Sequence, residues 1–445
     1  MGSFLHGAMS VVLLAPTVLI AVLGVPSLLR RPLNEAWTVT CTRFCTSAAF
    51  LAAIAALLMQ LSSGAEPSVL SLGEWFSPGA RGFDLALVVD GLSLVFVSLS
   101  AGICAVVAAF SSRYLHREPG FNRYFVQFAL FVQGITLVAL AGSIEVLLVG
   151  WELLGLSSAL LVGFFHERRA AVRNALRLFS VYRTSDAAML SAAVLLHHWA
   201  GSGSLSALFF RRSTADLTLR PVQALVVSAL LIAAVAGKSA LLPFSGWLPR
   251  AMEGPTPSSA VYYGALSIHA GCFLLLRVEP LLAQSMLAQG LAALAGGTTT
   301  IYATITARVQ TDVKSALAYS ALTQVGIIVV EIAVGLTSFA FVHMIGHMCF
   351  RILQFLVAPN ILHDLHALED RLEGRVATTR GALPRVVAKP SWFYLAALER
   401  GFVDALVDRC VFEPIQTLMR WLDRGDRMLC GSRATRERPV RTETR

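Results

Sequence analysis

Ionisable residues inside long apolar segments are the most informative feature of this sequence, and Lys238 is the first of them. The chain contains 36 lysines and arginines, but only Lys238, Lys314 and Lys389 are lysines. An arginine stays protonated in a protein, whereas a buried lysine can release its proton. A charged residue within a membrane span is costly and usually marks an ion path. We therefore expect Lys238 to carry protons; the alternative is that an arginine-rich chain simply retains few lysines.

Two carboxylates lie in the apolar segment 144–165. Glu152 follows Glu145 by seven residues, so the two lie on the same helix face, two turns apart. A carboxylate within a span usually faces the bundle interior and has a partner there. We expect the charge of Glu152 to modulate Lys238. Glu145 has two interpretations: a second residue of the ion path, or a solvated residue near the outer surface.

The apolar segment 176–196 contains a candidate ion pair. Arg183 and Asp186 are three residues apart, so their side chains can meet on one face of a helix. A static buried pair is the first interpretation of these two residues, and a part of the ion path is the second.

A polar stripe runs along the apolar segment 336–356. His343, His347 and Arg351 recur at every fourth position, which places them on one helix face. Because histidine titrates near neutral pH, two histidines in line with an arginine indicate a proton relay. Histidines that are merely hydrogen-bonded in the core are the alternative.

Weaker candidates occur in two other segments. His269 lies in the segment 257–276, about two turns after Tyr262 and Tyr263. Lys314 either continues the relay or pairs with Asp312 at the cytoplasmic end of a span.

The stretch from Val235 to Arg277 must position Lys238. Pro243 and Gly246 interrupt an apolar segment shortly after the lysine, and prolines and a glycine then turn the chain into the next apolar segment. Such irregular backbone is tolerated at membrane depth where it lines a cavity or is buried in protein. Broken helices of this kind form midplane ion sites in transporters.

Composition indicates the class of protein. Of the 445 residues, 56% are hydrophobic and 14% are charged, and apolar runs of about 20 residues recur, which is typical of an all-α polytopic membrane protein. We expect about eleven transmembrane helices. The predicted spans are 5–23, 47–61, 92–110, 124–140, 144–165, 176–196, 223–242, 257–276, 282–305, 316–332 and 336–356. The loop between spans 2 and 3, which holds Glu66, Glu74 and Asp84, is expected to be a polar outer loop with an interfacial segment.

The distribution of charge predicts topology rather than a nucleic-acid partner. Much of the net charge of +9 lies in short loops and in the C-terminal tail, which places the N-terminus outside and the C-terminus in the cytoplasm. The seven cysteines are scattered and predict no metal site. The sequence has no glycine-rich phosphate loop and no catalytic arrangement that spacing alone supports. It therefore predicts an ion-translocating subunit with no cofactor of its own, not an enzyme.

Four segments, in order, resemble the antiporter-like proton-conducting membrane family, which includes chains L, M and N of NADH-quinone oxidoreductase, the large subunits of Mrp antiporters, and DabB. They are VGWELLGLSSALLVGF (149–164), GKSALLPFSGWLPRAMEGPTPSSA (237–260), QTDVKSALAYSALTQVG (310–326) and HMIGHMCFRILQFL (343–356). The resemblance implies proton-path roles, and it assigns them by position to Glu152, Lys238, Lys314, His343 and His347.

Three residues depart from the family pattern. Arg351 stands where the family usually has lysine, and an arginine steers a proton rather than carrying one. Tyr263 stands where many members have histidine, and Ser245 replaces another common histidine.

The resemblance also implies a domain plan. Residues 1–122 are N-terminal transmembrane helices, and 123–281 form the first antiporter-like repeat, with its broken helix at 223–256. Residues 282–358 form a truncated second inverted repeat. A cytoplasmic tail, 359–445, has amphipathic helices at 362–372 and 392–429 and is expected to be disordered from about 432.

Within the family, the segment 237–260 and the tail are most similar to DabB, the membrane subunit of inorganic-carbon accumulation systems. This implies a bacterial inner-membrane location and a peripheral partner of the DabA type. DabA is related to β-carbonic anhydrases, so zinc is expected on the partner, and the complex uses ion flow to convert CO2 to bicarbonate. We expect the partner to dock at the cytoplasmic face and on residues 391–429; a helix on the lipid surface is the alternative for this tail.

Three rival functions remain open. The first is a proton-pumping subunit of a complex I-like or membrane hydrogenase complex, against which the shortened second repeat counts. The second is a cation/proton antiporter subunit. The third is a scaffold with an inert channel, which predicts that a Lys238→Ala variant keeps full function.

Overall fold

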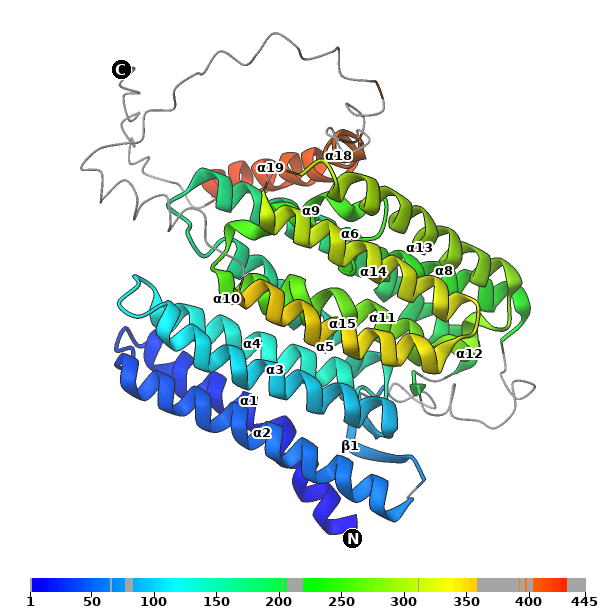
Figure 1. Cartoon of the computed structure of the whole chain (residues 1–445), viewed down its shortest axis with the longest axis horizontal. Coiled ribbons are helices and arrows are strands. Elements are labelled where there is room, and N and C mark those ends of the chain that lie inside the picture. The colour runs from blue at the N-terminus through cyan, green and yellow to red at the C-terminus, as the bar shows by residue number, and fades with distance from the viewer. Residues whose placement is uncertain are drawn as a thin grey trace.

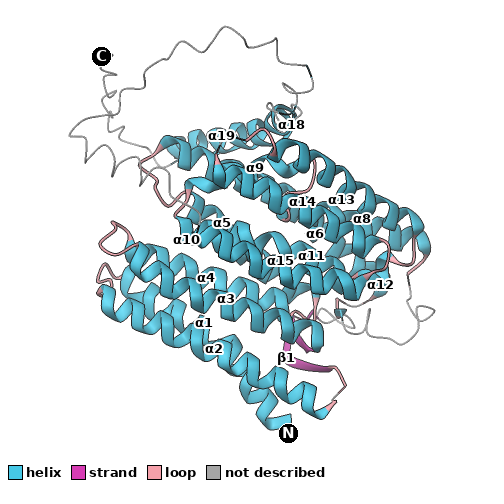
Figure 2. Cartoon of the chain, in the orientation of Figure 1, coloured by secondary structure: helices cyan, strands magenta, loops and turns pink. Residues whose placement is uncertain are grey.

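The computed structural model is a bundle of long helices (Figures 1 and 2). It describes residues 2–64, 66–76, 83–201, 203–205, 219–310, 312–357, 392, 397 and 403–429. The longest helices are α1 (Gly2–Leu28), α2 (Glu35–Ser63), α3 (Gly91–Tyr114), α4 (Phe121–Leu140), α5 (Ile144–Val162), α6 (Arg169–Ala200), α8 (Pro221–Lys238), α13 (Met286–Ala307), α14 (Val313–Ala333) and α15 (Thr337–Val357). The predicted helical membrane fold is therefore confirmed.

Each of the eleven predicted spans overlaps a helix, but only nine helices of the described ranges are long and apolar enough to be recognised as membrane spans. Helices α6 and α13 are the two others. Arg183 and Asp186 lower the mean hydropathy of α6, and threonines and glycines lower that of α13. The count of eleven spans stays a prediction.

The expected outer loop between α2 and α3 contains a β-hairpin that was not predicted from the sequence, in a structure that is otherwise mostly helical. Strands β1 (Ser68–Phe76) and β2 (Phe83–Val89) pair in an antiparallel sheet. The free edge of β2 is covered, because the Gly142 amide in the turn between α4 and α5 donates to the Ala86 carbonyl at 2.8 Å. A covered edge leaves fewer backbone groups unsatisfied.

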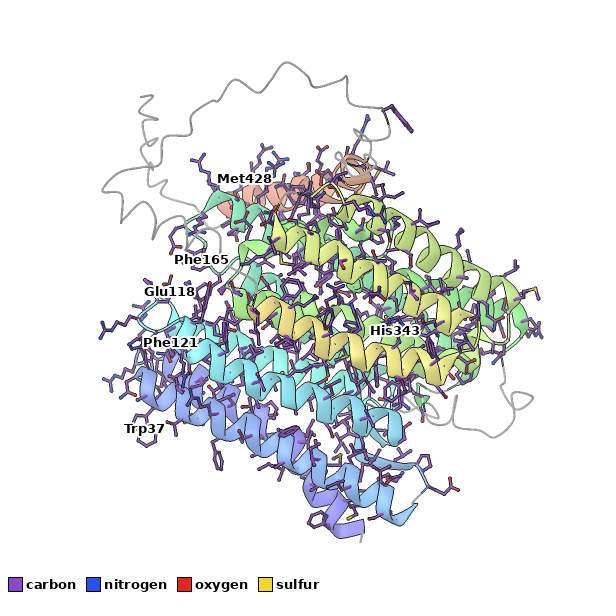
Figure 3. All side chains as sticks on the ribbon, viewed as in Figure 1. Trp37, Glu118, Phe121, Phe165, His343 and Met428 are labelled. Carbon is purple, nitrogen blue, oxygen red and sulfur yellow. The ribbon has the colours of Figure 1, made fainter. Side chains whose placement is uncertain are left out.

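The helices pack side by side, with α1 and α2 at one edge of the bundle and α6, α8, α13 and α14 towards the other (Figure 1). Side chains fill the spaces between the ribbons, whereas Trp37 on α2 points away from the bundle and is 61% exposed (Figure 3). The span Thr256–Arg277 is the most enclosed of the nine, with 94% of its residues buried. The segment that follows the predicted break therefore forms the centre of the protein.

The predicted break in the helix is present directly after Lys238, where α8 ends. Ala240 has a φ of 56°, a left-handed conformation that stops a helix. Three short pieces follow: the 3-10 helix η2 (Phe244–Gly246), α9 (Trp247–Arg250) and the 3-10 helix η3 (Ala251–Glu253). The central span is then built from α10 (Thr256–Ser258), the π-helix η4 (Ser259–Leu266) and α11 (Ser267–Arg277), and α12 (Glu279–Leu282) leads to α13.

A buried salt bridge anchors the end of this central span. Both terminal nitrogens of Arg277 bond to the Asp90 carboxylate, at 2.5 and 3.1 Å, and one also donates to the Ser93 hydroxyl at 2.6 Å. Asp90 in turn caps α3 by accepting from the Ser93 amide at 2.8 Å. Burial alone would raise the pKa of Asp90, but the hydrogen bonds and the charge of Arg277 more than offset this and lower it.

The C-terminal helix lies at the edge of the bundle (Figure 1). It consists of α18 (Val403–Val407), the π-helix η6 (Asp408–Phe412) and α19 (Glu413–Leu429). These elements match the predicted amphipathic segment 392–429 over residues 403–429. The other predicted tail helix, 362–372, lies outside the described residues.

Candidate functional site

Lys238 is the centre of the candidate site, and its side chain is fully buried. Its Nζ donates a hydrogen bond to the Trp151 carbonyl at 3.0 Å. The same atom lies 4.2 Å from the centre of the Tyr182 ring and 4.9 Å from that of Trp151. Aromatic faces attract a cation, and so does the carbonyl end of α8, which terminates here. The surroundings can hold an ammonium group in a place that excludes bulk water.

A chain of charges leads from this lysine to α5. Asp186 Oδ1 lies 4.0 Å from Lys238 Nζ, and Asp186 Oδ2 accepts a hydrogen bond from Arg183 at 2.7 Å. Arg183 also forms an ion pair with Glu152. The predicted pair of Arg183 and Asp186 is therefore present, but it is one link of a larger network. Glu152 is connected to Lys238 through these two residues rather than by direct contact.

Gly155 leaves room for the lysine. A Cβ atom at this position would lie 2.9 Å from Lys238 Nζ and 3.3 Å from the Tyr182 ring. We expect Gly155→Ala to displace the ammonium group and to lower ion transport severalfold, although alanine favours helix by about 1 kcal/mol over glycine. The control is Gly297→Ala on α13, where the added atom meets nothing within 4 Å. Equal transport by the two variants, measured in membrane vesicles, would contradict this prediction.

A second polar cluster joins α11 to α15. Arg351 Nε donates to His347 Nε2 at 2.9 Å, so His347 carries its proton on Nδ1 and donates it to His269 Nε2 at 2.8 Å. His269 then donates from Nδ1 to the Ala265 carbonyl. Another nitrogen of Arg351 donates to the Ser320 hydroxyl at 2.7 Å. Arg351 thus fixes the direction of the hydrogen bonds from His347 to His269 and on to Ala265. His269 therefore belongs to this cluster.

His343 lies apart from this pair. Its Nδ1 is 2.9 Å from a carboxylate oxygen of Glu331, and its Nε2 is 3.1 Å from the side-chain oxygen of Gln324. The centres of the His343 and His347 rings are 6.4 Å apart. The predicted stripe therefore divides into a histidine–carboxylate pair and a histidine–arginine cluster. Glu331, which is 9% exposed on α14, was not identified from the sequence.

The two remaining candidates, Lys314 and Tyr263, both involve the central span that follows the break. Lys314 donates to the Thr256 hydroxyl at 3.0 Å, and the Tyr114 hydroxyl lies 3.2 Å from the same oxygen. Asp312 caps α14, as its carboxylate accepts from the Ser315 amide. Tyr263 donates to the Ser158 carbonyl at 3.2 Å.

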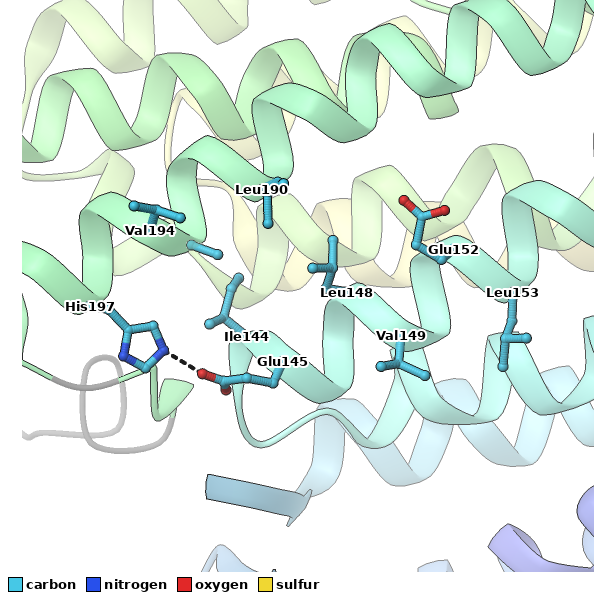
Figure 4. A pocket seen from close by; sticks show the side chains of 10 residues that line it. Ile144, Glu145, Leu148, Val149, Glu152, Leu153, Leu190, Val194 and His197 are labelled. Atoms are coloured by element: carbon cyan, nitrogen blue, oxygen red, sulfur yellow. Dashed lines mark hydrogen bonds and ion pairs between the residues drawn. The ribbon is translucent and has the colours of Figure 1, made fainter. Parts of the chain in front are cut away.

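Only 9% of the Glu145 side chain is exposed, so it does not lie on the open surface. It hydrogen-bonds to His197 at the other end of the α5–α6 pair (Figure 4). Glu145, Glu152 and His197 all line a cavity of about 530 Å³ between these helices. His197 was not identified from the sequence, because its partner lies 52 residues away and no local pattern connects them.

The C-terminal helix is tied to α6, which carries part of the lysine network, and to α9. Asp408 pairs with the buried Arg177 of α6, which also lies 5.5 Å from the centre of the Phe412 ring. Asp404 pairs with Arg250 of α9 at 2.8 Å. These contacts link the tail to α6 and to the broken segment.

We expect Asp408→Asn to weaken the docking of this helix, because Arg177 would lose the charge of its partner. Removing one member of a buried pair costs about 3–5 kcal/mol, and partial exposure of Asp408 reduces this to the lower end. The measurement is the rate of limited proteolysis within residues 403–429, with the exposed Asp423→Asn as the control. Equal cleavage rates for both variants would contradict the prediction.

Two family models match this chain. Residues 141–377 match the family model of the NADH:quinone oxidoreductase/Mrp antiporter transmembrane region, and residues 75–125 match the model of the complex I chain 5 N-terminus. The chain is 32% identical over 325 residues to NADH-ubiquinone oxidoreductase chain 5 of Sus scrofa, covering 73% of this chain and 52% of that protein. It is 31% identical over 326 residues to subunit L of NADH-quinone oxidoreductase of Mycobacterium tuberculosis, covering 73% and 51%.

Solved structures share the fold. The Mrp complex of Dietzia sp. DQ12-45-1b aligns with a TM-score of 0.66 and 28% identity, covering 84% of this chain and 38% of that chain. An archaeal membrane-bound sulfane sulfur reductase aligns with a TM-score of 0.69 and 20% identity, covering 88% and 77%. The chain spans about half the length of the curated relatives it matches. With more than half of its residues matched by one family model, this chain is a multi-pass membrane protein that belongs to the NADH:quinone oxidoreductase/Mrp antiporter transmembrane family.

Proposed function

We propose that this chain conducts protons across a membrane as one subunit of a larger complex. The observation that carries the proposal is the fully buried Lys238, held at the broken end of α8 by groups from α5 and α6. A group that alternates between charged and neutral forms within a span is suited to moving a proton. The similar chains bear the names of a chain or subunit of multi-subunit assemblies, which supports the larger complex.

We propose an order for the path, the first part of which follows the contacts from Glu152 to Lys238. Protons enter beside Glu152 and reach Lys238 through Arg183 and Asp186. They then move past Lys314 towards the cluster of His269 and His347, and leave at the cytoplasmic face. Arg351 orients this cluster and is not itself a carrier, because a guanidinium does not release its proton.

The test is proton flux in membrane vesicles that contain the complete complex, followed with a pH-sensitive dye under an imposed membrane potential. We expect flux in vesicles with the complex, and none above background in vesicles from which this chain is deleted. A sodium gradient imposed in its place separates proton conduction from cation/proton exchange. Sodium-driven proton movement would favour the antiporter alternative.

A finer proposal names the complex as an inorganic-carbon accumulation system, based on the similarity of residues 237–260 to DabB. The partner would be a DabA-type zinc protein docked on the C-terminal helix. Exposed apolar side chains on α19, namely Leu418, Trp421 and Leu422, offer such a partner a surface. Arginines beside them equally suit a lipid surface. A redox-driven complex is the second candidate, and the relatives named as NADH oxidoreductase chains favour it.

Growth of a bacterium that lacks carbonic anhydrases separates these two complexes. The chain is expressed together with a DabA-type protein, and growth in ordinary air is measured. Rescue supports carbon accumulation. Failure despite normal assembly leaves proton conduction in place and favours the redox-driven complex.

A further inference from the structure

The cavity between α5 and α6 opens beside the lysine network and has an unusual lining (Figure 4). Three of its ten lining residues are ionisable, and the other seven are apolar. Figure 4 shows Glu145 bonded to His197 at one end, while Glu152 lies further along α5 with Leu148 between the two carboxylates. An apolar cavity with a carboxylate at each end is not explained by packing alone.

Glu145 points to a ligand in this cavity. Its Oε1 bonds to His197, but its Oε2 is buried and has no hydrogen-bond partner among the described residues. Leaving a buried carboxylate oxygen without a partner is costly. A water molecule can donate the hydrogen bond that this oxygen lacks. A cavity of about 530 Å³ has ample room for several water molecules.

The spacing of the two carboxylates fits a short chain of water. Seven residues separate Glu145 from Glu152, which is about 10 Å along a helix axis. This is too far for direct proton transfer, but a few water molecules can bridge it. Leu148 and Leu190 line the space between the two ends. Leu190 is 52% exposed, so the cavity is open on the side of α6.

We propose that this cavity is the water-filled inlet through which protons reach Glu152, and that Glu145 and His197 form its receiving pair. A hydronium ion releases its proton to the pair, the proton passes through water to the Glu152 carboxylate, and the pair returns to its first state. The predicted topology places the start of α5 and the end of α6 at the outer face. The proposal rests on the proposed proton conduction, and it adds Glu145 and His197 to the path.

The presence of water is tested by cysteine labelling, in full-length protein whose seven native cysteines are replaced. A membrane-impermeant thiosulfonate reagent is added from the outer side to Leu148→Cys. Such reagents need a thiolate, which forms in water and not in lipid. The controls are Leu156→Cys, exposed on α5 but not lining the cavity, and the buried Leu154→Cys. We expect Leu148→Cys to react at least about tenfold faster than either control. Equal rates would overturn the inlet.

The receiving pair is tested by proton flux through the complete complex. We expect Glu145→Gln and His197→Gln each to lower flux at least about tenfold. Since the two residues act as a unit, the double variant should be no slower than the slower single variant. Glu145→Asp should restore part of the flux. The neighbouring and exposed His198→Gln is the control.

A Lys238→Ala variant in the same vesicles separates the two proposals. If Lys238→Ala abolishes flux while both pair variants keep the wild-type rate, the inlet is refuted and proton conduction stands. If Lys238→Ala keeps the wild-type rate, the proposed function fails, and the labelling of Leu148→Cys still decides whether water enters the cavity.

Discussion

Replacing Lys238 with alanine is expected to lower proton flux by at least about 100-fold while the complex still assembles. The lysine is the titratable group nearest the break in α8, and its Nζ connects the charges of α6 to the carbonyl of Trp151. Without it, the path from Asp186 has no group to receive the proton. Assembly should persist, because Asp186 keeps its hydrogen bond to Arg183 at 2.7 Å.

Two further variants distinguish titration from packing. Lys238→Met approximately retains the length of the side chain but has no charge. Lys238→Arg retains the charge but does not release its proton. Both are expected to be as inactive as Lys238→Ala in vesicle flux measurements. The half-buried Lys314→Ala should lose less, as its Nζ bonds to a neutral hydroxyl on Thr256. If Lys238→Met conducts protons at the wild-type rate, Lys238 is a packing residue and the scaffold alternative gains support.

Replacing Arg277 with leucine is expected to cost about 3–5 kcal/mol of stability, the largest loss that we predict for one substitution. The guanidinium is 5% exposed and binds Asp90 with both terminal nitrogens. Leucine would leave the carboxylate buried without its counter-charge. The measurement is thermal unfolding of the purified protein in detergent, with the exposed Arg308→Ala as the control.

A double variant and a pH series test whether the unpaired Asp90 carboxylate causes this loss of stability. Asp90→Asn combined with Arg277→Leu should recover part of the loss, since no uncompensated charge remains buried. Because the pKa of Asp90 is lowered in the folded protein, its contribution to stability is present above the ordinary carboxyl pKa and is lost as the pH falls through the lowered value. Wild-type protein should show this acid-dependent loss, and Arg277→Leu should not. The same acid profile in both proteins would mean that other carboxylates determine it.

Local sequence patterns were sufficient to predict the helices and the break. Hydropathy and length determine where a segment can cross a membrane, and all eleven predicted segments overlap helices. Pro243 and Gly246 predicted a break shortly after Lys238, because proline and glycine act on the backbone where they stand. The helix ends a few residues earlier than these two positions, at Lys238, before Ala240 adopts a left-handed conformation. The hairpin was missed, since β1 pairs with a strand across a turn and its stability depends on that pairing.

The ionisable residues were also recognisable from the sequence alone, since a charge within an apolar run is visible without a structure. Their partners were not. Asp186 looked like the local partner of Arg183, and it also faces Lys238 on another helix. His269 and His347 are 78 residues apart, and only the packing of α11 against α15 brings their rings together.

The sequence by itself therefore determined which segments form long apolar helices and on which helix face each ionisable residue lies, because both follow from composition and from the 3.6-residue period of the helix. The tertiary structure decided which charges meet. It joined Glu145 to His197, His343 to Glu331, and Asp404 to Arg250, in each case between separate helices. A hydrogen bond depends on a distance of about 3 Å, and only the packing of helices fixes distances at that scale.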